Sequence, residues 1–261
     1  MLRAIHSELI RLNRPSFLVG GIGLMAGFAS IATILAFSAA GKSGMGPGQY
    51  IPTAAALAAS DGFVSGLALA SNIVGIVALA AWAIAVASDY GTGLIRLLVQ
   101  AEPRRYRLLV GKLVALVLYT LVSTLAATLA AAGTAALIAP MFHVSTDAWG
   151  ANTILTLTQA FVYLSLSTVA WGVIGLSIAT ITMSSGVAIA VGVGYLVVFE
   201  NMLLLVVKGA ANWLPGAILT ALAVGGTPNI GFNKALALGA IYVLIGLILV
   251  VAIVQRREIT Y

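Results

Sequence analysis

Charged side chains gather in one internal segment of this chain, residues 88–112. The segment holds five of the thirteen Lys and Arg residues, together with Asp89, Glu102 and the helix-breaking Pro103. Guanidinium and ammonium groups at this density bind carboxylates and phosphates, on a protein partner or on anionic lipid. Long apolar runs flank the segment on both sides. We therefore expect it to act as a docking loop.

One carboxylate lies inside an apolar run, Glu200 in the sequence VVFENMLLL. A charge in hydrocarbon is costly, and such a residue is a candidate for a functional site. Glu200 could act directly on a substrate or in gating. It could instead cap a neighbouring helix, or pair with Asn201 or Lys208. A single such group is too little for an ion-coupled pump, which needs a chain of carriers.

Patterns for catalysis are absent from the sequence. The two histidines, His6 and His143, lie outside the apolar runs, and zero cysteines exclude disulfides and thiolate metal sites. Residues 62–66 come close to GxSxG but have no histidine partner in the membrane. Residues 36–43, AFSAAGKS, resemble a phosphate-binding loop yet follow an apolar run rather than a strand. We expect no catalytic residue, metal ligand or cofactor in this chain.

The composition is that of an integral membrane protein. Hydrophobic residues make up 61% of the 261 residues and charged residues 8%, against about 25% charged in a soluble domain. Six runs exceed the roughly 20 apolar residues that cross a bilayer. We expect one all-α membrane domain over residues 1–261, with six transmembrane helices at about 17–40, 63–87, 113–139, 154–179, 184–207 and 234–254.

The positions of the basic residues predict the orientation. If both termini are cytoplasmic, the inner segments hold ten Lys and Arg residues, and the outer side holds Lys42, Lys208 and Lys234. This bias follows the positive-inside rule. The net charge of +6 then reflects lipid-facing flanks rather than nucleic-acid binding. We expect a multi-pass protein of the plasma membrane, the inner membrane of a bacterial cell.

Three segments outside the spans are expected to be helical. Residues 1–16 place leucine and isoleucine on one face and arginine on others before Pro15, which predicts an interfacial amphipathic helix. Residues 89–102 can form a second surface helix that ends at Pro103. In the outer segment 208–233, the apolar stretch 217–224 is too short to span and predicts a re-entrant or surface helix.

The segment 89–112 resembles the first cytoplasmic loop of ABC-2-type permeases, the membrane subunits of type V ABC transporters. In that family an acidic residue closes the second span, and a glycine or alanine followed by lysine opens the third. The Asp that closes the span here stands where glutamate is common. The remaining chain, including Glu200, is consistent with the family. The matching residues are Asp89, Gly91-Thr92, Arg96, Leu97-Leu98, Pro103-Arg104-Arg105 and Gly111-Lys112.

This resemblance implies the permease subunit of an ATP-driven exporter whose cargo is hydrophobic or amphipathic, such as a drug, lipid or peptide. A separate cytoplasmic ATPase would bind ATP and magnesium, and the permease would pair with a second copy or a sister subunit in the lipid bilayer. The alternatives are an ATP-independent channel or envelope scaffold, and a loop that only anchors lipid. The resemblance assigns ATPase coupling to Asp89, Gly91, Thr92, Arg96, Glu102, Pro103, Arg104 and Arg105.

Overall fold

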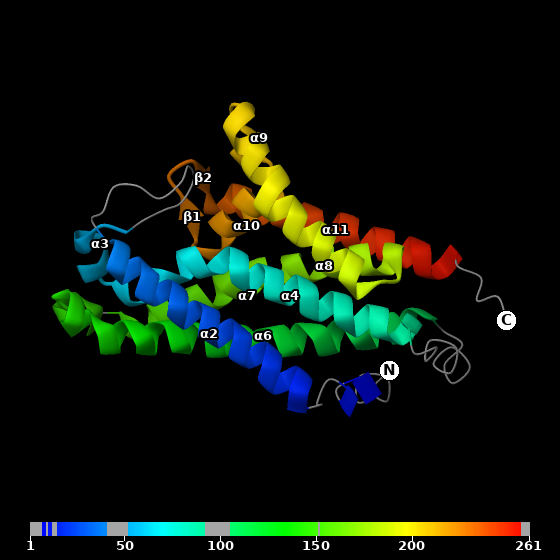
Figure 1. The fold of residues 1–261 in the computed structure, drawn as a ribbon, viewed down its shortest axis with the longest axis horizontal. Coiled ribbons are helices and arrows are strands. Elements are labelled where there is room, and N and C mark those ends of the chain that lie inside the picture. The colour runs from blue at the N-terminus through cyan, green and yellow to red at the C-terminus, as the bar shows by residue number, and fades with distance from the viewer. Residues whose placement is uncertain are drawn as a thin grey trace.

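The computed structural model describes residues 7–8, 10–11, 15–40, 52–91, 105–150 and 152–256 (Figure 1). Within these residues, six helical segments are long and apolar enough to cross a membrane, in agreement with the six expected runs. The segments are Phe17–Ala39, Gly62–Asp89, Leu108–Phe142, Thr153–Thr182, Ser185–Val206 and Phe232–Arg256.

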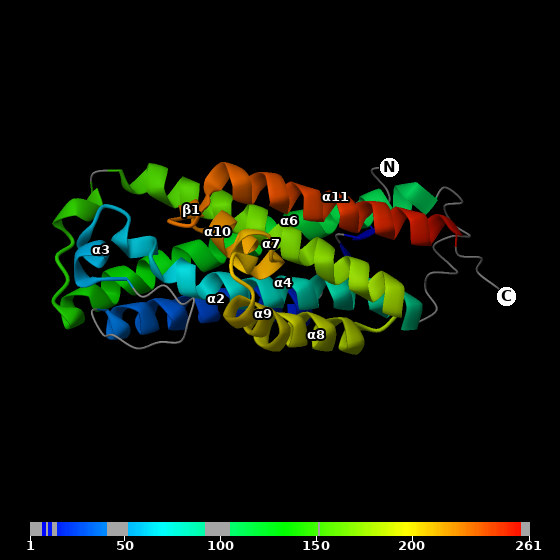
Figure 2. The ribbon, with the colours of Figure 1, turned by 90° about the horizontal axis from the view of Figure 1, so that it is seen from above.

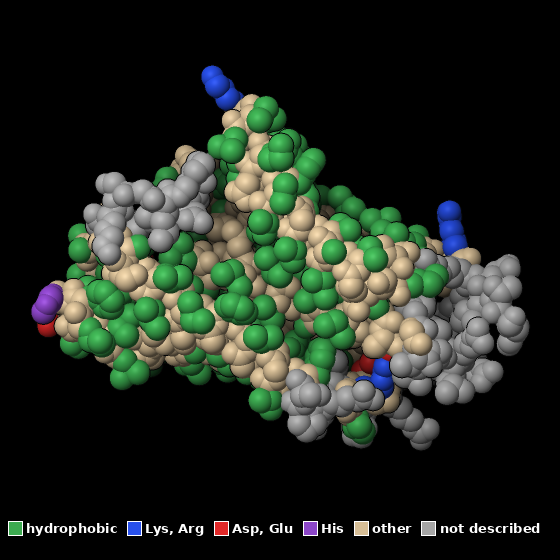
Figure 3. Space-filling model, in the orientation of Figure 1, with side chains coloured by type: hydrophobic (Ala, Val, Ile, Leu, Met, Phe, Trp, Pro, Cys, Tyr) green, Lys and Arg blue, Asp and Glu red, His purple; other side chains and the backbone are tan. Residues whose placement is uncertain are grey.

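The long helices form an elongated bundle with two of them at its centre. The bundle helices are α2 (Pro15–Ala39), α4 (Gly66–Gly91), α6 (Arg105–Ile138), α7 (Thr153–Thr182), α8 (Ser185–Gly194) and α11 (Phe232–Arg256). The most apolar windows of the α4 and α7 segments are each 61% buried, against 17% for that of α11 and 22% for that of α2. Helix α2 packs on α6 and α4, while α11 packs on α7 and α8 on α4 (Figure 2). Figure 3 shows hydrophobic side chains along the whole length of one face.

Glycines and tryptophans interlock the two central helices. A Cβ on Gly75 of α4 would come within 2.3 Å of the Trp171 ring, and one on Gly172 of α7 within 2.5 Å of the Trp82 ring. Each glycine therefore makes room for an indole of the opposite helix. The indole nitrogen of Trp82 donates to Thr120 Oγ1 on α6 at 2.9 Å, which ties the third helix to the pair.

Hydroxyl groups of α7 are used within the helix bundle. Ser165 hydrogen-bonds Thr124 of α6, and Ser167 donates to the carbonyl of Leu219. Five more hydroxyls bond back to carbonyls one turn earlier in their own helix, as Ser and Thr commonly do. These five are Thr158, Thr168, Ser177, Thr180 and Thr182.

The fifth span is interrupted and is followed by a compact excursion of the chain. A π-helical turn, η4 (Tyr195–Glu200), separates α8 from α9 (Asn201–Val206), which leans away from the bundle in Figure 1. The chain then returns through η5 (Ala210–Asn212) into α10 (Pro215–Ala223). The expected short helix at 217–224 is present, and six of its nine residues are buried. It packs against α7, α11 and α4.

A two-stranded hairpin follows α10, an exception to the expected all-α fold. Strands β1 (Gly226–Thr227) and β2 (Ile230–Gly231) pair antiparallel. Two-residue strands leave no alternating apolar pattern in the sequence, so residue patterning could not predict them.

Short helices close the end of the bundle where α2 and α6 finish. Trp149 is buried among them: its indole nitrogen donates to the Leu57 carbonyl at 3.0 Å, and its ring contacts Phe63 and Phe37. The ring contacts of Trp149 are apolar, while the side chains of His143 and Asp147 are exposed at this end. The short helices are α3 (Ala54–Ala58), η1 (Gly62–Val64), η2 (Ala139–Phe142) and η3 (Asp147–Gly150).

Candidate functional site

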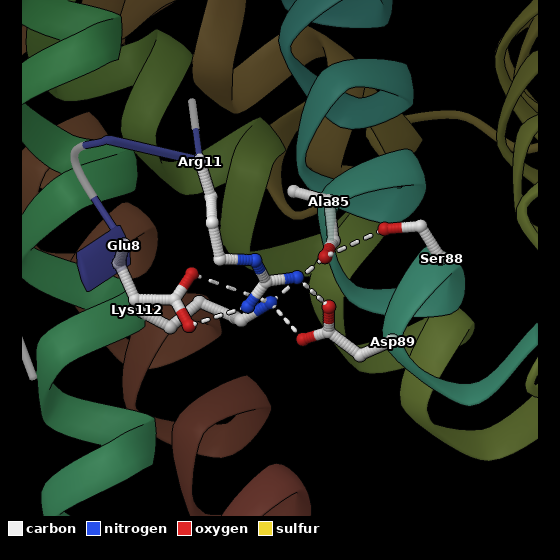
Figure 4. A network of polar contacts seen from close by, with 6 residues as sticks. All are labelled: Glu8, Arg11, Ala85, Ser88, Asp89 and Lys112. Atoms are coloured by element: carbon white, nitrogen blue, oxygen red, sulfur yellow. Dashed lines mark hydrogen bonds and ion pairs between the residues drawn. The ribbon is translucent and has the colours of Figure 1, made fainter. Parts of the chain in front are cut away.

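Four charged side chains meet where α4 ends and α6 begins (Figure 4). Asp89 of α4 accepts hydrogen bonds from Lys112 Nζ of α6 and from Arg11 Nη2 of the N-terminal segment. Arg11 Nη1 also donates to Glu8 Oε1 at 2.8 Å, and Lys112 Nζ lies 3.8 Å from Glu8 Oε2. We call these four residues, Glu8, Arg11, Asp89 and Lys112, the charge cluster.

The charge cluster is largely withdrawn from solvent. The side chain of Asp89 is 4% exposed, that of Lys112 12% and that of Arg11 27%. Buried charges persist only when they are paired and hydrogen-bonded, because desolvation of an isolated ion costs several kcal/mol. Two carboxylates face two cations here, so the cluster is balanced. Removing any one member leaves a net buried charge.

Arg11 is held in its charged form. Burial alone would lower its pKa, but the hydrogen bonds and negative charges of Asp89 and Glu8 outweigh burial and raise the pKa above its ordinary value. Arg11 therefore remains a cation throughout the range in which proteins work.

The helix ends themselves help to position Lys112. Its ammonium group donates to the Ala85 carbonyl at 2.8 Å, in the last turns of α4. Carbonyls at a helix C-terminus carry partial negative charge, so a cation is favoured there. Lys112 thus joins α6 to both the backbone and the side chains of α4.

The structure contains three of the eight residues assigned to ATPase coupling. Asp89 and Gly91 lie in the last turn of α4, and Arg105 is the first residue of α6. The remaining five, Thr92, Arg96, Glu102, Pro103 and Arg104, lie outside the described residues.

The expected start of a surface helix at residue 89 is wrong, because residues 89–91 continue α4. The physical reason is the charge cluster. Two cations neutralise Asp89, so α4 can carry a buried carboxylate and continue to Gly91.

The N-terminal segment is tied to the bundle by its charged residues. Residues 7–8 and 10–11 are helical, as expected, but Arg11 faces Asp89 rather than lying apart from the protein. Glu8 and Arg11 were not predicted to belong to a site. Their opposite charges three positions apart are one signal of such a role, since residues at this spacing share a helix face.

Glu200 caps α10. Its carboxylate accepts hydrogen bonds from the backbone amides of Gly216 at 2.9 Å and Ala217 at 2.7 Å, the first residues after Pro215. Helix N-termini bind anions because their first amides have no partner within the helix. The alternative that Glu200 caps a neighbouring helix is confirmed. Within the described residues, neither Asn201 nor Lys208 pairs with the carboxylate.

The described part of the chain offers no group of three or more His, Asp or Glu side chains that could hold a metal ion. The charge cluster can hold helices together and transmit a displacement between them. The Glu200 cap can hold the fifth span to α10.

Comparisons with known proteins give a family and no activity. None of the curated proteins matches the sequence. A family model described as a protein of unknown function (DUF2705) matches residues 30–260. The match includes Asp89, Lys112 and Glu200 and begins after Glu8 and Arg11. Because it extends over most of the 261 residues, the chain belongs to the DUF2705 family.

Proposed function

We propose that this chain is the membrane-spanning permease subunit of an ATP-driven exporter, driven by a separate cytoplasmic ATPase. The proposal starts from the resemblance of residues 89–112 to ABC-2-type permeases. The ATPase would carry ATP and magnesium, and the permease would provide the path for a hydrophobic or amphipathic cargo. The ten basic residues at the proposed inner side support a cytoplasmic position for the charged end of the bundle.

The pairing of Asp89 with Lys112 is the observation that carries the proposal. These residues stand at the two ends of the segment that resembles the coupling loop, and their side chains bond directly to each other. The end of α4 and the start of α6, on either side of residues 92–104, are therefore held together. A partner that pushed on this segment would act on α4 and α6 together.

The N-terminal segment extends this unit. Arg11 hydrogen-bonds Asp89, and Glu8 lies beside Lys112. Helix α2 begins at Pro15, four residues after Arg11. A force on the charge cluster would thus reach α2 as well. We propose that the ATPase-contacting loop and the N-terminal helix form one cytoplasmic unit, and that the N-terminal helix lies on the inner leaflet.

A second permease copy would pack on the exposed face of α2. Gly23 and Gly27 are exposed, and a Cβ on either would meet no described atom within 4 Å, so neither glycine is used for packing within the described residues. Small residues four apart allow two membrane helices to approach closely. A sister subunit with a similar helix would serve equally.

The test combines assembly and ATP hydrolysis in a reconstituted complex of permease and ATPase. Alanine at Arg96, Glu102 and Arg104 together should reduce ATPase binding or cargo-stimulated hydrolysis, since truncating one partner of a buried interface charge pair costs about 2–5 kcal/mol. Asp147→Ala, an exposed carboxylate at the opposite end, is the matched control.

Two results would contradict the proposal. If the triple variant assembles and hydrolyses ATP as the wild type does, the loop is a lipid anchor instead. If the purified protein binds no ATPase and conducts solute without ATP, it is a channel or scaffold.

A further inference from the structure

The fifth span changes its helical geometry in its outer half. Residues Tyr195–Glu200 form a π-helical turn between α8 and α9. A π-turn widens the backbone and leaves helical carbonyls unpaired, and such turns are frequent at functional sites. Asn201, the next residue, donates its side-chain amide to the carbonyls of Leu196 at 3.1 Å and Val197 at 3.0 Å. The Asn201 side chain therefore supplies hydrogen-bond donors to two backbone carbonyls of this turn.

The two sides of this turn are anchored very differently. Below it, α8 packs on α4, with Ala188 and Gly192 buried and Gly192 pressed against the Leu79 side chain. Above it, α9 has no buried residue and leans out of the bundle (Figure 1). Among the described residues, its main contacts are with η4 and η5, its neighbours along the chain.

Two side chains connect the turn to the rest of the bundle. Leu196 packs against the buried cluster that contains Trp171 and Leu219. Glu200 is buried at the end of the turn, and both of its carboxylate oxygens accept hydrogen bonds from the amides of α10. Gly216 makes the close approach possible, because a Cβ there would lie 2.4 Å from Glu200 Oε1.

The position of α10 makes this contact a lock. Helix α10 is buried against α7, α11 and α4, so its amides belong to the rigid part of the molecule. The Glu200 carboxylate therefore holds the π-turn against α10 and the helices that surround it. Release of these two hydrogen bonds would remove the polar contact between Glu200 and α10.

We propose that the turn Tyr195–Glu200 is a hinge in the fifth span, and that the Glu200 carboxylate locks it by binding the amides of Gly216 and Ala217. When the lock is closed, α9 is held at one angle to the bundle. When it opens, α9 swings while α8 stays on α4. The hinge is a property of this chain and does not depend on which partner drives it.

The absence of cysteine from the sequence allows a direct test with pairs of spin labels. One pair joins Val206 of α9 to Ile154 of α7, and the control pair joins Val187 of α8 to Ile154. All three side chains are exposed. Distance distributions are measured by double electron–electron resonance in lipid nanodiscs, for the wild type, Glu200→Ala and Asp147→Asn.

We expect Glu200→Ala to broaden or shift the Val206–Ile154 distribution and to leave the Val187–Ile154 distribution unchanged. Glu200→Gln should fall between wild type and alanine, because its amide oxygen can still accept one hydrogen bond. Asp147→Asn should match the wild type for both pairs.

The hinge is refuted if Glu200→Ala leaves the Val206–Ile154 distribution unchanged. It is equally refuted if both pairs broaden together, since that would mean a loosened bundle. If Glu200→Ala does not accumulate, Gly216→Ala replaces it: Glu200 remains, but a Cβ at position 216 would lie 2.4 Å from Glu200 Oε1 and should displace the carboxylate from the α10 amides. An unchanged Val206–Ile154 distribution in that variant would also overturn the proposal.

Discussion

Asp89 and Lys112 bond to each other across a separation of 23 positions in the sequence. Asp89 lies in the last turn of α4 and Lys112 in the first turns of α6, so their contact holds the ends of these two helices together. Arg11 joins the same carboxylate from the N-terminal side. Three parts of the chain that are distant in sequence therefore depend on a single buried carboxylate.

Replacing Asp89 with alanine should destabilise the protein. Lys112 and Arg11 would lose their shared partner at a site with little solvent, and we expect a loss of about 3 kcal/mol, because breaking a buried ion pair costs about 3–5 kcal/mol and Glu8 remains. The free energy of unfolding can be followed by tryptophan fluorescence during titration with sodium dodecyl sulfate in mixed micelles. Asp147→Ala should change it by less than about 0.5 kcal/mol, as exposed substitutions usually do. Equal losses in the two variants would contradict the role of the charge cluster.

The proposed orientation predicts which positions react from outside the cell. The native chain has no cysteine, so single cysteines report cleanly. A cysteine at Ser43 or at the exposed Ser145 should react with a membrane-impermeant thiol reagent in intact cells, and one at Gln100 should react only after permeabilisation. The physical reason is the concentration of basic residues around position 100. The reverse labelling pattern would exclude the proposed topology.

Gly172→Ala should destabilise the central helix pair. The new methyl group would lie about 2.5 Å from the Trp82 ring, and overpacking of this kind costs about 1–3 kcal/mol. Gly133→Ala in α6 is the matched control, because Gly133 is exposed and a Cβ there meets nothing within 4 Å. We expect that control to keep the unfolding free energy, measured in the same micelles. If Gly172→Ala is as stable as Gly133→Ala, the α4–α7 interface is looser than described.

Thr120→Val should cost stability through an unpaired indole. Thr120 is buried and supplies the acceptor for the Trp82 N–H at 2.9 Å, and a buried donor left without a partner costs about 1–3 kcal/mol. Thr120→Ser keeps the hydroxyl and should lose much less. Thermal unfolding of the two variants in detergent compares valine with serine directly. A valine variant as stable as the serine variant would show that Trp82 finds another acceptor.

The sequence by itself determined the six spans and the charged interruption between the second and third. Apolar runs of more than 20 residues allow little alternative to a membrane helix, because every backbone polar group must then be paired within the segment. The short helix before Gly225 and Gly226 also followed from its length and its flanking glycine and proline. The sequence also identifies Glu200 as a residue that needs a partner, because it is a charge in an apolar run, and a helix N-terminus is one such partner.

Only the tertiary structure decided which partners those charges have. Asp89, Lys112 and Arg11 come together because α4, α6 and the N-terminal segment end at the same side of the bundle, and nothing local in the sequence encodes that meeting. The interlocking of Gly75 with Trp171 and of Gly172 with Trp82 depends on the register of two helices separated by α6 in the chain. The amides that Glu200 binds lie 16 and 17 positions later in the chain, so packing of α10 against the bundle brings them to this carboxylate. Helical periodicity predicts a face for each residue, but contacts between distant elements select the partner on that face.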